Sequence, residues 1–260
     1  MQTLNETSPA RDLAGKVVLI TGGGTGLGAV IARHFAEAGA AVAVHYSRSE
    51  QEAQTTVAGL RALGGHAEAV RAELNGNAAV GEVEKMIQRI AREFGGLDVV
   101  VNNAAATRAV PFPRLEALTA EDWDLVLNVN AKAPFFVAQA AAPLLRQSRG
   151  QIINTASISG IRARGGSSIA YSVSKAATIH LTKCLATALS PEVRVNAVAP
   201  GIMQTRWLAH FSEAQIEASI EQAPLHKTTD LDDTARVYLM LARNTSMTGQ
   251  VIVVDAGISL

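Results

Sequence analysis

Lys16-Val-Val-Leu-Ile-Thr21 leads directly into Gly22-Gly-Gly-Thr-Gly-Leu-Gly28, and this stretch of sequence decides the fold. The apolar run, rich in β-branched residues, is typical of a strand that is buried on both faces of a parallel sheet. The glycines allow a tight turn and let an anion such as a phosphate approach the N-terminus of the helix that follows. The stretch therefore predicts a strand, a phosphate-binding turn and a helix, in that order.

The same alternation of short apolar runs and helical patterns continues along the chain. Thr119, with Asp122 three residues later, resembles a capping box and predicts a long helix that runs towards Arg146. A small helix of its own is predicted over residues 213–222. The other strands are predicted over residues 41–44, 66–73, 97–101, 151–154, 193–198 and 250–254, and the other helices over residues 29–38, 50–63, 77–94, 171–189 and 230–242.

Short connections between alternating strands and helices predict right-handed crossovers. We therefore expect a single doubly wound α/β (Rossmann) domain over residues 15–260, with a seven-stranded parallel sheet flanked by helices. Residues 1–14 are polar and contain Pro9, so they are expected to form a loosely ordered N-terminal arm. Ligands of such domains bind beyond the carboxyl ends of the strands, which is where the functional residues are expected.

The composition argues against several classes of partner. The chain of 260 residues has 23 Lys and Arg against 23 Asp and Glu, which speaks against a broad surface for nucleic acid or anionic membranes. Residues 1–12 lack the apolar run of a signal peptide. The single cysteine, Cys184, is expected to be a buried structural thiol, and no His/Cys/Asp cluster has the spacing of a metal site. We expect a soluble, cytoplasmic protein without a metal.

Tyr171 and Lys175 are the first candidates for chemistry. Residues four apart lie one turn apart on the same face of a helix. A phenol has a pKa of about 10 in water, so it gives up its proton reluctantly at neutral pH. An ammonium fixed beside it is expected to lower that pKa and to make the phenol a usable general acid or base.

The motifs, taken together, resemble the short-chain dehydrogenase/reductase family, of the 3-oxoacyl-carrier-protein reductase or carbonyl reductase type. The glycine stretch has the family's Thr-Gly-x-x-x-Gly-x-Gly form rather than G-x-G-x-x-G. Ala105 and Ala256 stand where the family usually has glycine. The resemblance continues in order through Asn102-Asn-Ala-Ala105, Asn130 in Asn128-Val-Asn-Ala131, Ser157 in Asn154-Thr-Ala-Ser-Ile-Ser-Gly160, Tyr171 and Lys175, Asn196-Ala-Val-Ala-Pro-Gly201 with Thr205, and Val254-Asp-Ala-Gly257.

This resemblance implies hydride transfer between a nicotinamide and a carbonyl or secondary alcohol. It assigns Tyr171 as the proton donor and Lys175 as the group that lowers its pKa and bonds the nicotinamide ribose. Ser157 is expected to donate a hydrogen bond to the developing oxyanion, where a fixed donor contributes most. Ser159 is a rival for this role, but Ser157 matches the family position. Asn130 is expected to hold a water that links Lys175 to solvent.

The end of the second strand favours NADP(H) over NAD(H). A strand that selects a free ribose usually ends in Asp or Glu, whereas here Tyr46-Ser-Arg-Ser49 precedes the first carboxylate, Glu50. Arg48 suits a 2′-phosphate, with Ser47, Ser49 and His45 assisting. Glu73 stands at the adenine-contacting position, and Pro200 to Ile202 with Thr205 should hold the carboxamide. The predicted cofactor-binding residues are Gly22, Thr25, Gly26, Leu27, Gly28, Tyr46, Ser47, Arg48, Ser49, Glu73, Leu74, Asn103, Ala104, Ala105, Tyr171, Lys175, Pro200, Gly201, Ile202 and Thr205.

Residues 202–225 are expected to form a lid over the substrate, which is predicted to be a small molecule with an apolar or aromatic portion. Residues 162–168 and 107–110 should complete the pocket. Family members are usually homotetramers, joined partly through helices at residues 121–146 and 171–189, and the same assembly is expected here. The apolar lid residues are Met203, Trp207, Leu208, Phe211 and Ile216.

Three other functions stay open. Residues 45–49 and 130–136 resemble segments of pteridine reductases, although those enzymes commonly carry Asp in place of Ser157. A 3-oxoacyl-carrier-protein reductase would need a basic surface for its acidic carrier, which Arg162 and Arg164 could provide. A catalytically silent cofactor sensor is disfavoured because Tyr171 and Lys175 are both present.

Overall fold

The computed structural model of the chain describes residues 11–76, 78–163 and 167–260. Its centre is a sheet of seven parallel strands in the order β3-β2-β1-β4-β5-β6-β7. The strand order reverses between β1 and β4, which confirms the predicted doubly wound α/β fold. The strands are β1 (Val17–Ile20), β2 (Ala41–Tyr46), β3 (Ala67–Arg71), β4 (Val99–Asn102), β5 (Gln151–Thr155), β6 (Arg194–Pro200) and β7 (Val251–Val254).

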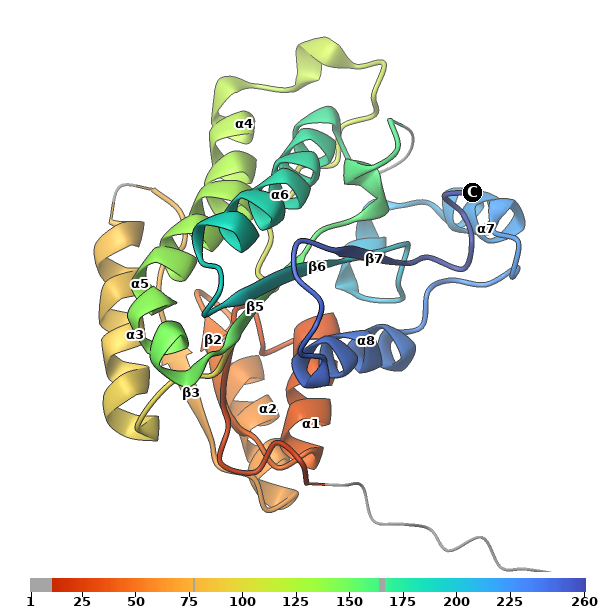
Figure 1. The fold of residues 1–260 in the computed structure, drawn as a ribbon. Coiled ribbons are helices and arrows are strands. Elements are labelled where there is room, and N and C mark those ends of the chain that lie inside the picture. The colour runs from red at the N-terminus through yellow and green to blue at the C-terminus, as the bar shows by residue number, and fades with distance from the viewer. Residues whose placement is uncertain (1–10, 77, 164–166) are drawn as a thin grey trace, which may run out of the picture.

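Helices cover both faces of the sheet (Figure 1). One face carries α1, α2 and α8, and the other carries α3, α5 and α6. None of the helices in the described part of the chain is long and apolar enough to cross a membrane. The helices are α1 (Gly26–Glu37), α2 (Glu50–Ala62), α3 (Ala79–Phe94), α4 (Ala120–Leu127), α5 (Ala133–Ser148), α6 (Ile169–Ala188), α7 (Glu213–Gln222) and α8 (Leu231–Arg243), with short turns η1 (Leu115–Ala117), η2 (Asn128–Lys132), η3 (Ile158–Gly160) and η4 (Arg206–His210).

The core lies in two layers, one on each side of the sheet. Val18 and Ile20 of β1 pack into the layer beneath α1, α2 and α8, while Val17 and Leu19 pack into the layer beneath α3, α5 and α6. Successive side chains of a strand point to opposite faces, so a strand covered on both faces must be apolar at every position. This explains why β1 is a continuous apolar run.

The long helix predicted from Thr119 towards Arg146 is present, but it is not a regular α-helix throughout. Its start is confirmed, because Thr119 and Asp122 form the capping box. A π-helical segment, η2, joins α4 to α5, so the helical backbone continues from Ala120 to Ser148. The carbonyl oxygen of Asn130 in this segment accepts a hydrogen bond from Thr178 Oγ1 of α6, at 2.9 Å. Contact with α6 therefore stabilises a local distortion that helical periodicity alone does not reveal.

Two further predictions need correction. Residues 1–10 of the predicted arm lie outside the described residues, but residues 11–14 are held in place. The Leu13 side chain is buried, and both oxygens of Asp12 accept hydrogen bonds from Arg243 at 2.7 Å. Cys184 is exposed on α6 and is not the buried thiol that we predicted. The apolar neighbours of Cys184 in the sequence do not all lie on the buried face of that helix.

A chain of buried hydrogen bonds fastens α6 to the middle of the sheet. Asn102 Nδ2 at the end of β4 donates to Asn154 Oδ1 of β5, and Asn154 Nδ2 donates to Thr182 Oγ1 of α6, both at 2.9 Å. The Thr182 hydroxyl in turn donates to the carbonyl oxygen of Thr178 at 2.8 Å. The side chain of Asn154 has no solvent exposure. The position of α6 is therefore fixed by directional contacts as well as by apolar packing.

Replacing Asn154 with Ala should lower the free energy of unfolding by about 3 kcal/mol, because it leaves buried polar groups of Asn102 and Thr182 without partners. Urea denaturation monitored by circular dichroism measures the change. Gln54→Ala on the exposed side of α2 is the matched control and should cost less than about 0.5 kcal/mol. A loss below about 1 kcal/mol for Asn154→Ala would show that the buried chain contributes little.

Candidate active site

A cavity of about 890 Å³ opens at the carboxyl ends of the strands. Its walls come from the loop after β1, the ends of β2, β3, β4, β5 and β6, the start of α6 and the segment with η4 and α7. Every residue predicted for catalysis or cofactor binding lines it, with the single exception of Asn130. The fold therefore brings together residues from 22 to 205 at the place where doubly wound sheets bind ligands.

The glycine loop is shaped by close approach of the backbone. Gly22 and Gly26 have positive φ angles of 63° and 53°, which favour glycine. A Cβ on Gly28 would lie 2.2 Å from the Gly22 carbonyl oxygen, so only glycine lets α1 pack this closely. Among the described residues, no side chain caps the first turn of α1. The helix N-terminus therefore faces the cavity with N–H groups available to an anion.

The side chains of His45 and Asn103 form hydrogen bonds with the backbone of the glycine loop. His45 Nδ1 accepts from the Gly22 N–H at 3.1 Å, and Nε2 lies 3.1 Å from the Ala72 carbonyl oxygen. Burial lowers the pKa of His45 to about 4, so its ring is neutral at physiological pH. The prediction that His45 assists a phosphate is therefore wrong, because this ring supports the loop instead. Asn103 Nδ2 donates to the carbonyl oxygens of Thr21 and Gly22 at 3.1 and 3.2 Å.

The loop after β2 forms one end of the cavity with the segment after β3. Ser47 Oγ donates to Glu73 Oε2 at 2.9 Å, and Glu73 Oε1 accepts from the N–H groups of Leu74 and Asn75 at 3.0 Å. Desolvation opposes ionisation of Glu73, but these hydrogen bonds and the charge of Arg48 lower its pKa. Glu73 is thus an ionised carboxylate that holds Ser47, with the exposed Arg48 close by.

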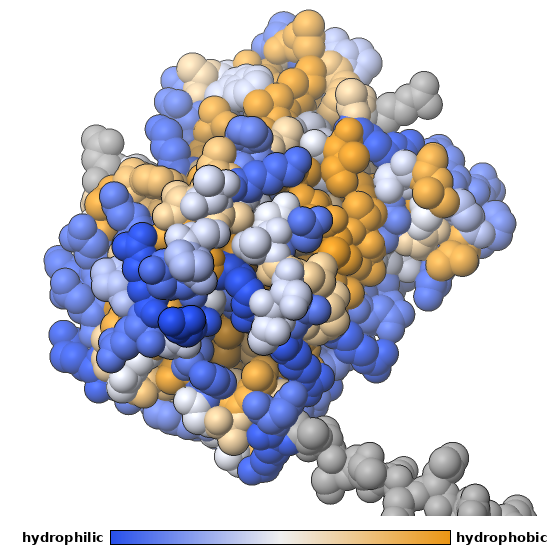
Figure 2. Space-filling view, in the orientation of Figure 1, coloured by the Kyte–Doolittle hydropathy of each residue, from blue (hydrophilic) through white to orange (hydrophobic). Residues whose placement is uncertain are grey.

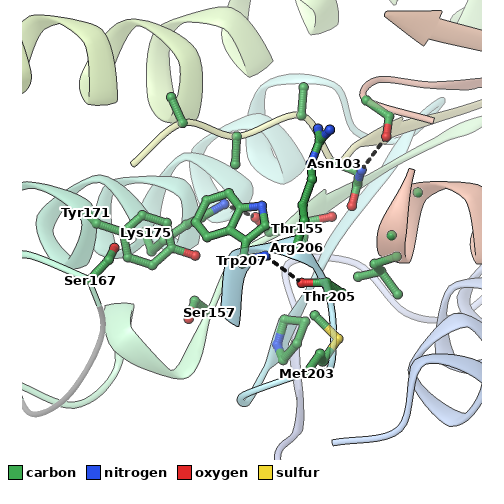
Figure 3. A pocket seen from close by; sticks show the side chains of 18 of the residues that line it. Asn103, Thr155, Ser157, Ser167, Tyr171, Lys175, Met203, Thr205, Arg206 and Trp207 are labelled. Atoms are coloured by element: carbon green, nitrogen blue, oxygen red, sulfur yellow. Dashed lines mark hydrogen bonds between the residues drawn. The ribbon is translucent and has the colours of Figure 1, made fainter. Parts of the chain in front are cut away.

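Tyr171 and Lys175 lie together on α6, as predicted (Figure 3). The ammonium of Lys175 is 5.7 Å from the centre of the Tyr171 ring and donates to the Thr155 carbonyl oxygen at 2.7 Å. Burial lowers the pKa of Lys175 to about 7. Burial also raises the pKa of Tyr171 to about 12, against the effect of a hydrogen bond with Ser157. Desolvation of the phenolate therefore dominates the pKa of Tyr171 in this structure, and the lowering of that pKa by Lys175 stays a prediction.

Ser157 reaches Tyr171 because η3 packs directly on the backbone of α6. Ser157 caps η3, and its Oγ accepts from the Ser159 N–H at 3.1 Å. A Cβ on Gly160 would lie 2.5 Å from the carbonyl carbon of Lys175, so glycine is required for this contact. Both Ser157 and Ser159 line the cavity, but Ser157, the favoured serine, is the one that hydrogen-bonds the tyrosine.

Asn130 occupies a different place from the other predicted residues. Its Nδ2 donates to the Ala106 carbonyl oxygen and to Ser174 Oγ, both at 2.9 Å, and its Oδ1 accepts from the Ala106 N–H at 2.8 Å. The side chain therefore joins the segment after β4 to α6, one residue away from Lys175. Its role in resupplying a proton stays a prediction.

The lid predicted over residues 202–225 contains η4 and α7. Met203, Trp207, Leu208 and Phe211 line the cavity, and the Trp207 ring lies 5.6 Å from the Tyr171 ring. Ile216 and residues 107–110 do not line it, although all of them are described. Of the predicted wall over residues 162–168, Arg162 and Ser167 line the cavity, whereas Arg164 lies outside the described residues.

Two further residues that line the cavity, Thr155 and Arg206, were not predicted from the sequence. Thr155 holds Lys175 through its main-chain carbonyl, which a side-chain motif does not reveal. Arg206 lines the cavity directly after Thr205, where the motif that carried the prediction ends. A cation beside a predicted carboxamide contact was the signal that could have found it. The described residues contain no cluster of three or more His, Cys, Asp or Glu side chains that could hold a metal.

Known proteins resemble this chain over nearly its whole length. A family model described as enoyl-(acyl carrier protein) reductase matches residues 22–259. A Streptomyces violaceoruber protein named as ketoacyl reductase 2 of the granaticin polyketide synthase is 37% identical over 247 residues, which cover 94% of this chain and 96% of that protein. The 3-oxoacyl-acyl-carrier-protein reductase FabG of Thermotoga maritima is 35% identical over 250 residues, covering 95% and 98%.

Among solved structures, a short chain dehydrogenase from Burkholderia cenocepacia in complex with NADP is 36% identical, with a TM-score of 0.88. The match covers 95% of this chain and 99% of that one. The chain belongs to the short-chain dehydrogenase/reductase family, as the motifs predicted.

Replacing Lys175 with Met should raise the free energy of unfolding, and the gain should be larger near pH 7 than near pH 10. Burial lowers the pKa of Lys175 from 10.5 to about 7, so between these values the unfolded chain binds a proton that the folded chain lacks. Wild-type stability therefore falls as the pH drops from 10.5 to about 7, by about 1.4 kcal/mol per pH unit, and Met avoids this loss.

Urea unfolding at about pH 9 and about pH 7 tests this, and the advantage of Lys175→Met over the wild type should widen by about 2 kcal/mol between them. Lys183→Met, on the exposed side of the same helix, is the control and should show a constant difference. A constant difference for Lys175→Met would contradict the shifted pKa.

Proposed function

We propose that this chain is an NADP(H)-dependent oxidoreductase that transfers hydride between nicotinamide and a ketone or secondary alcohol. The observation that carries the proposal is the convergence of Ser157, Tyr171 and Lys175 in one cavity with the glycine loop. The cavity fits the cofactor: its glycine cradle would be filled by a Cβ at Gly28, and a helix N-terminus and Arg48 suit the phosphates. NADP(H), when bound, supplies or accepts the hydride.

The protein residues handle the proton. With a pKa of about 12, Tyr171 is protonated at neutral pH and is ready to donate its proton to the substrate oxygen. Ser157, hydrogen-bonded to the same phenol, donates to the oxyanion that develops there. Lys175 has a pKa of about 7, so both of its protonation states are accessible and it can return a proton towards the tyrosine. Asn130 completes the proposed route from solvent.

Tyr171→Phe should reduce turnover at least about 1,000-fold, because it removes the proton donor while the ring remains. Consumption of NADPH is measured with a panel of ketones that includes a 3-oxoacyl thioester. Binding of NADPH, followed by its fluorescence, should be nearly unchanged. A variant that keeps substantial turnover would refute the assignment of Tyr171 as the proton donor.

Arg48→Ala should weaken NADPH binding by about tenfold or more, because a charge-assisted contact to the 2′-phosphate is lost. Binding of NADH, which lacks this phosphate, should change little. Arg61→Ala is the matched control, since Arg61 is exposed, pairs with Glu68 and does not line the cavity. A wild-type enzyme that prefers NADH would contradict the proposed role of Arg48.

A 3-oxoacyl thioester is the second candidate substrate, because relatives of this chain are named as ketoacyl and 3-oxoacyl-acyl-carrier-protein reductases. The apolar lid residues, with Trp207 beside Tyr171, favour a substrate with an apolar portion next to its carbonyl. Ser157 stands where pteridine reductases commonly carry Asp, which disfavours that alternative.

We also propose a homotetramer. The edge strand β7 leaves one side of its backbone unpaired within the described sheet, and Val253 on this strand is 41% exposed. Apolar surface gathers around this end of the sheet, between α6 and α7 (Figure 2). Such a face suits a second copy of the chain. The location in the cytoplasm stays a prediction.

A further inference from the structure

Arg206 lies at the junction between the lid and the glycine loop. It is the first residue of η4, and the Thr205 side chain before it caps this turn by accepting from the Trp207 N–H at 3.3 Å. A Cβ on Gly26 would lie 3.5 Å from Thr205 Cγ2, so η4 begins against the first turn of α1. In Figure 3 the Arg206 side chain extends from the lid towards the side of the cavity where Asn103 lies.

The other cations of the cavity are placed for different tasks. Lys175 is buried against the Thr155 carbonyl oxygen, and Arg162 donates to the carbonyl oxygen of Ile258. Arg48 stands at the far end, near Glu73. Arg206 is exposed and, within the described part of the chain, forms no ion pair. Of these four cations, Arg206 is the one that follows directly on the contact between the lid and α1.

We propose that Arg206 binds the pyrophosphate of the nicotinamide cofactor from the lid side, opposite the N-terminus of α1. This inference rests on the proposed function, because it concerns the same cofactor. A pyrophosphate carries two negative charges, whereas a helix N-terminus offers the equivalent of about half a positive charge. A guanidinium supplies the missing charge and can bond two phosphate oxygens at once.

This contact connects the two halves of the cavity. Trp207, the next residue of η4, lies 5.6 Å from the Tyr171 ring and forms a wall of the substrate pocket. Because Arg206 and Trp207 share one short turn, binding of the pyrophosphate by Arg206 holds Trp207 beside the proton donor. Arg206 is thus a cofactor-binding residue that also positions the lid.

The test compares two probes on the purified full-length protein. NADP⁺ contains the pyrophosphate, whereas adenosine 2′-phosphate carries only the 2′-phosphate. Their dissociation constants are measured by isothermal titration calorimetry for the wild type, Arg206→Gln and Arg206→Lys. Arg206→Gln should weaken NADP⁺ binding about tenfold and leave adenosine 2′-phosphate unchanged, and Arg206→Lys should restore part of the loss.

Lys227→Gln is the matched control, because Lys227 is an exposed cation just beyond the lid that does not line the cavity. It should bind both probes as the wild type does. Unchanged NADP⁺ affinity in Arg206→Gln, or an equal loss for both probes, would overturn the inference while leaving the proposed function standing. Failure of the wild type to bind NADP⁺ would overturn both.

Discussion

The structure of the site depends on the buried hydrogen bonds that fix α6 to the sheet. Asn154 of β5 lies between Asn102 of β4 and Thr182 of α6, where an unpaired polar group would be costly. Apolar packing alone would allow α6 to slide or rotate along the sheet, whereas these directional contacts set its position. Tyr171 and Lys175 lie on this helix, so their distance from the glycine loop follows from contacts one to three turns away.

This firm placement has a chemical consequence. The ammonium of Lys175 and the phenol of Tyr171 are both held where water is excluded, and burial shifts their pKa values towards the neutral forms. The pKa of Lys175 falls and the pKa of Tyr171 rises. Lys175 is therefore the stronger acid of the two in the folded protein, whereas in water the phenol is slightly the stronger acid. A group buried for its chemistry in this way lowers the stability of the fold, as is common in active sites.

The sequence was most informative where backbone sterics and local periodicity decide the structure. The apolar run of β1, the glycines at 22, 26 and 28 and the capping box at Thr119 carry their structural requirement in the residue type itself. The π-helical segment at Asn130 and the exposure of Cys184 were not predictable, because both depend on how helices face their neighbours. Likewise, the neutral state of His45 follows from burial between a loop and a strand that are adjacent only in the fold.

The lid also contains residues whose contacts could not be predicted from the sequence. Thr205, Arg206 and Trp207 are consecutive, yet they meet α1, the open cavity and Tyr171 respectively. The predicted motif ends at Thr205, while the positions of the two residues after it depend on the turn that η4 makes. The segment from Thr205 to Trp207 therefore contacts both the glycine loop and the ring of Tyr171. Because both contacts come from this one short segment, the two ends of the cavity are joined through the start of η4.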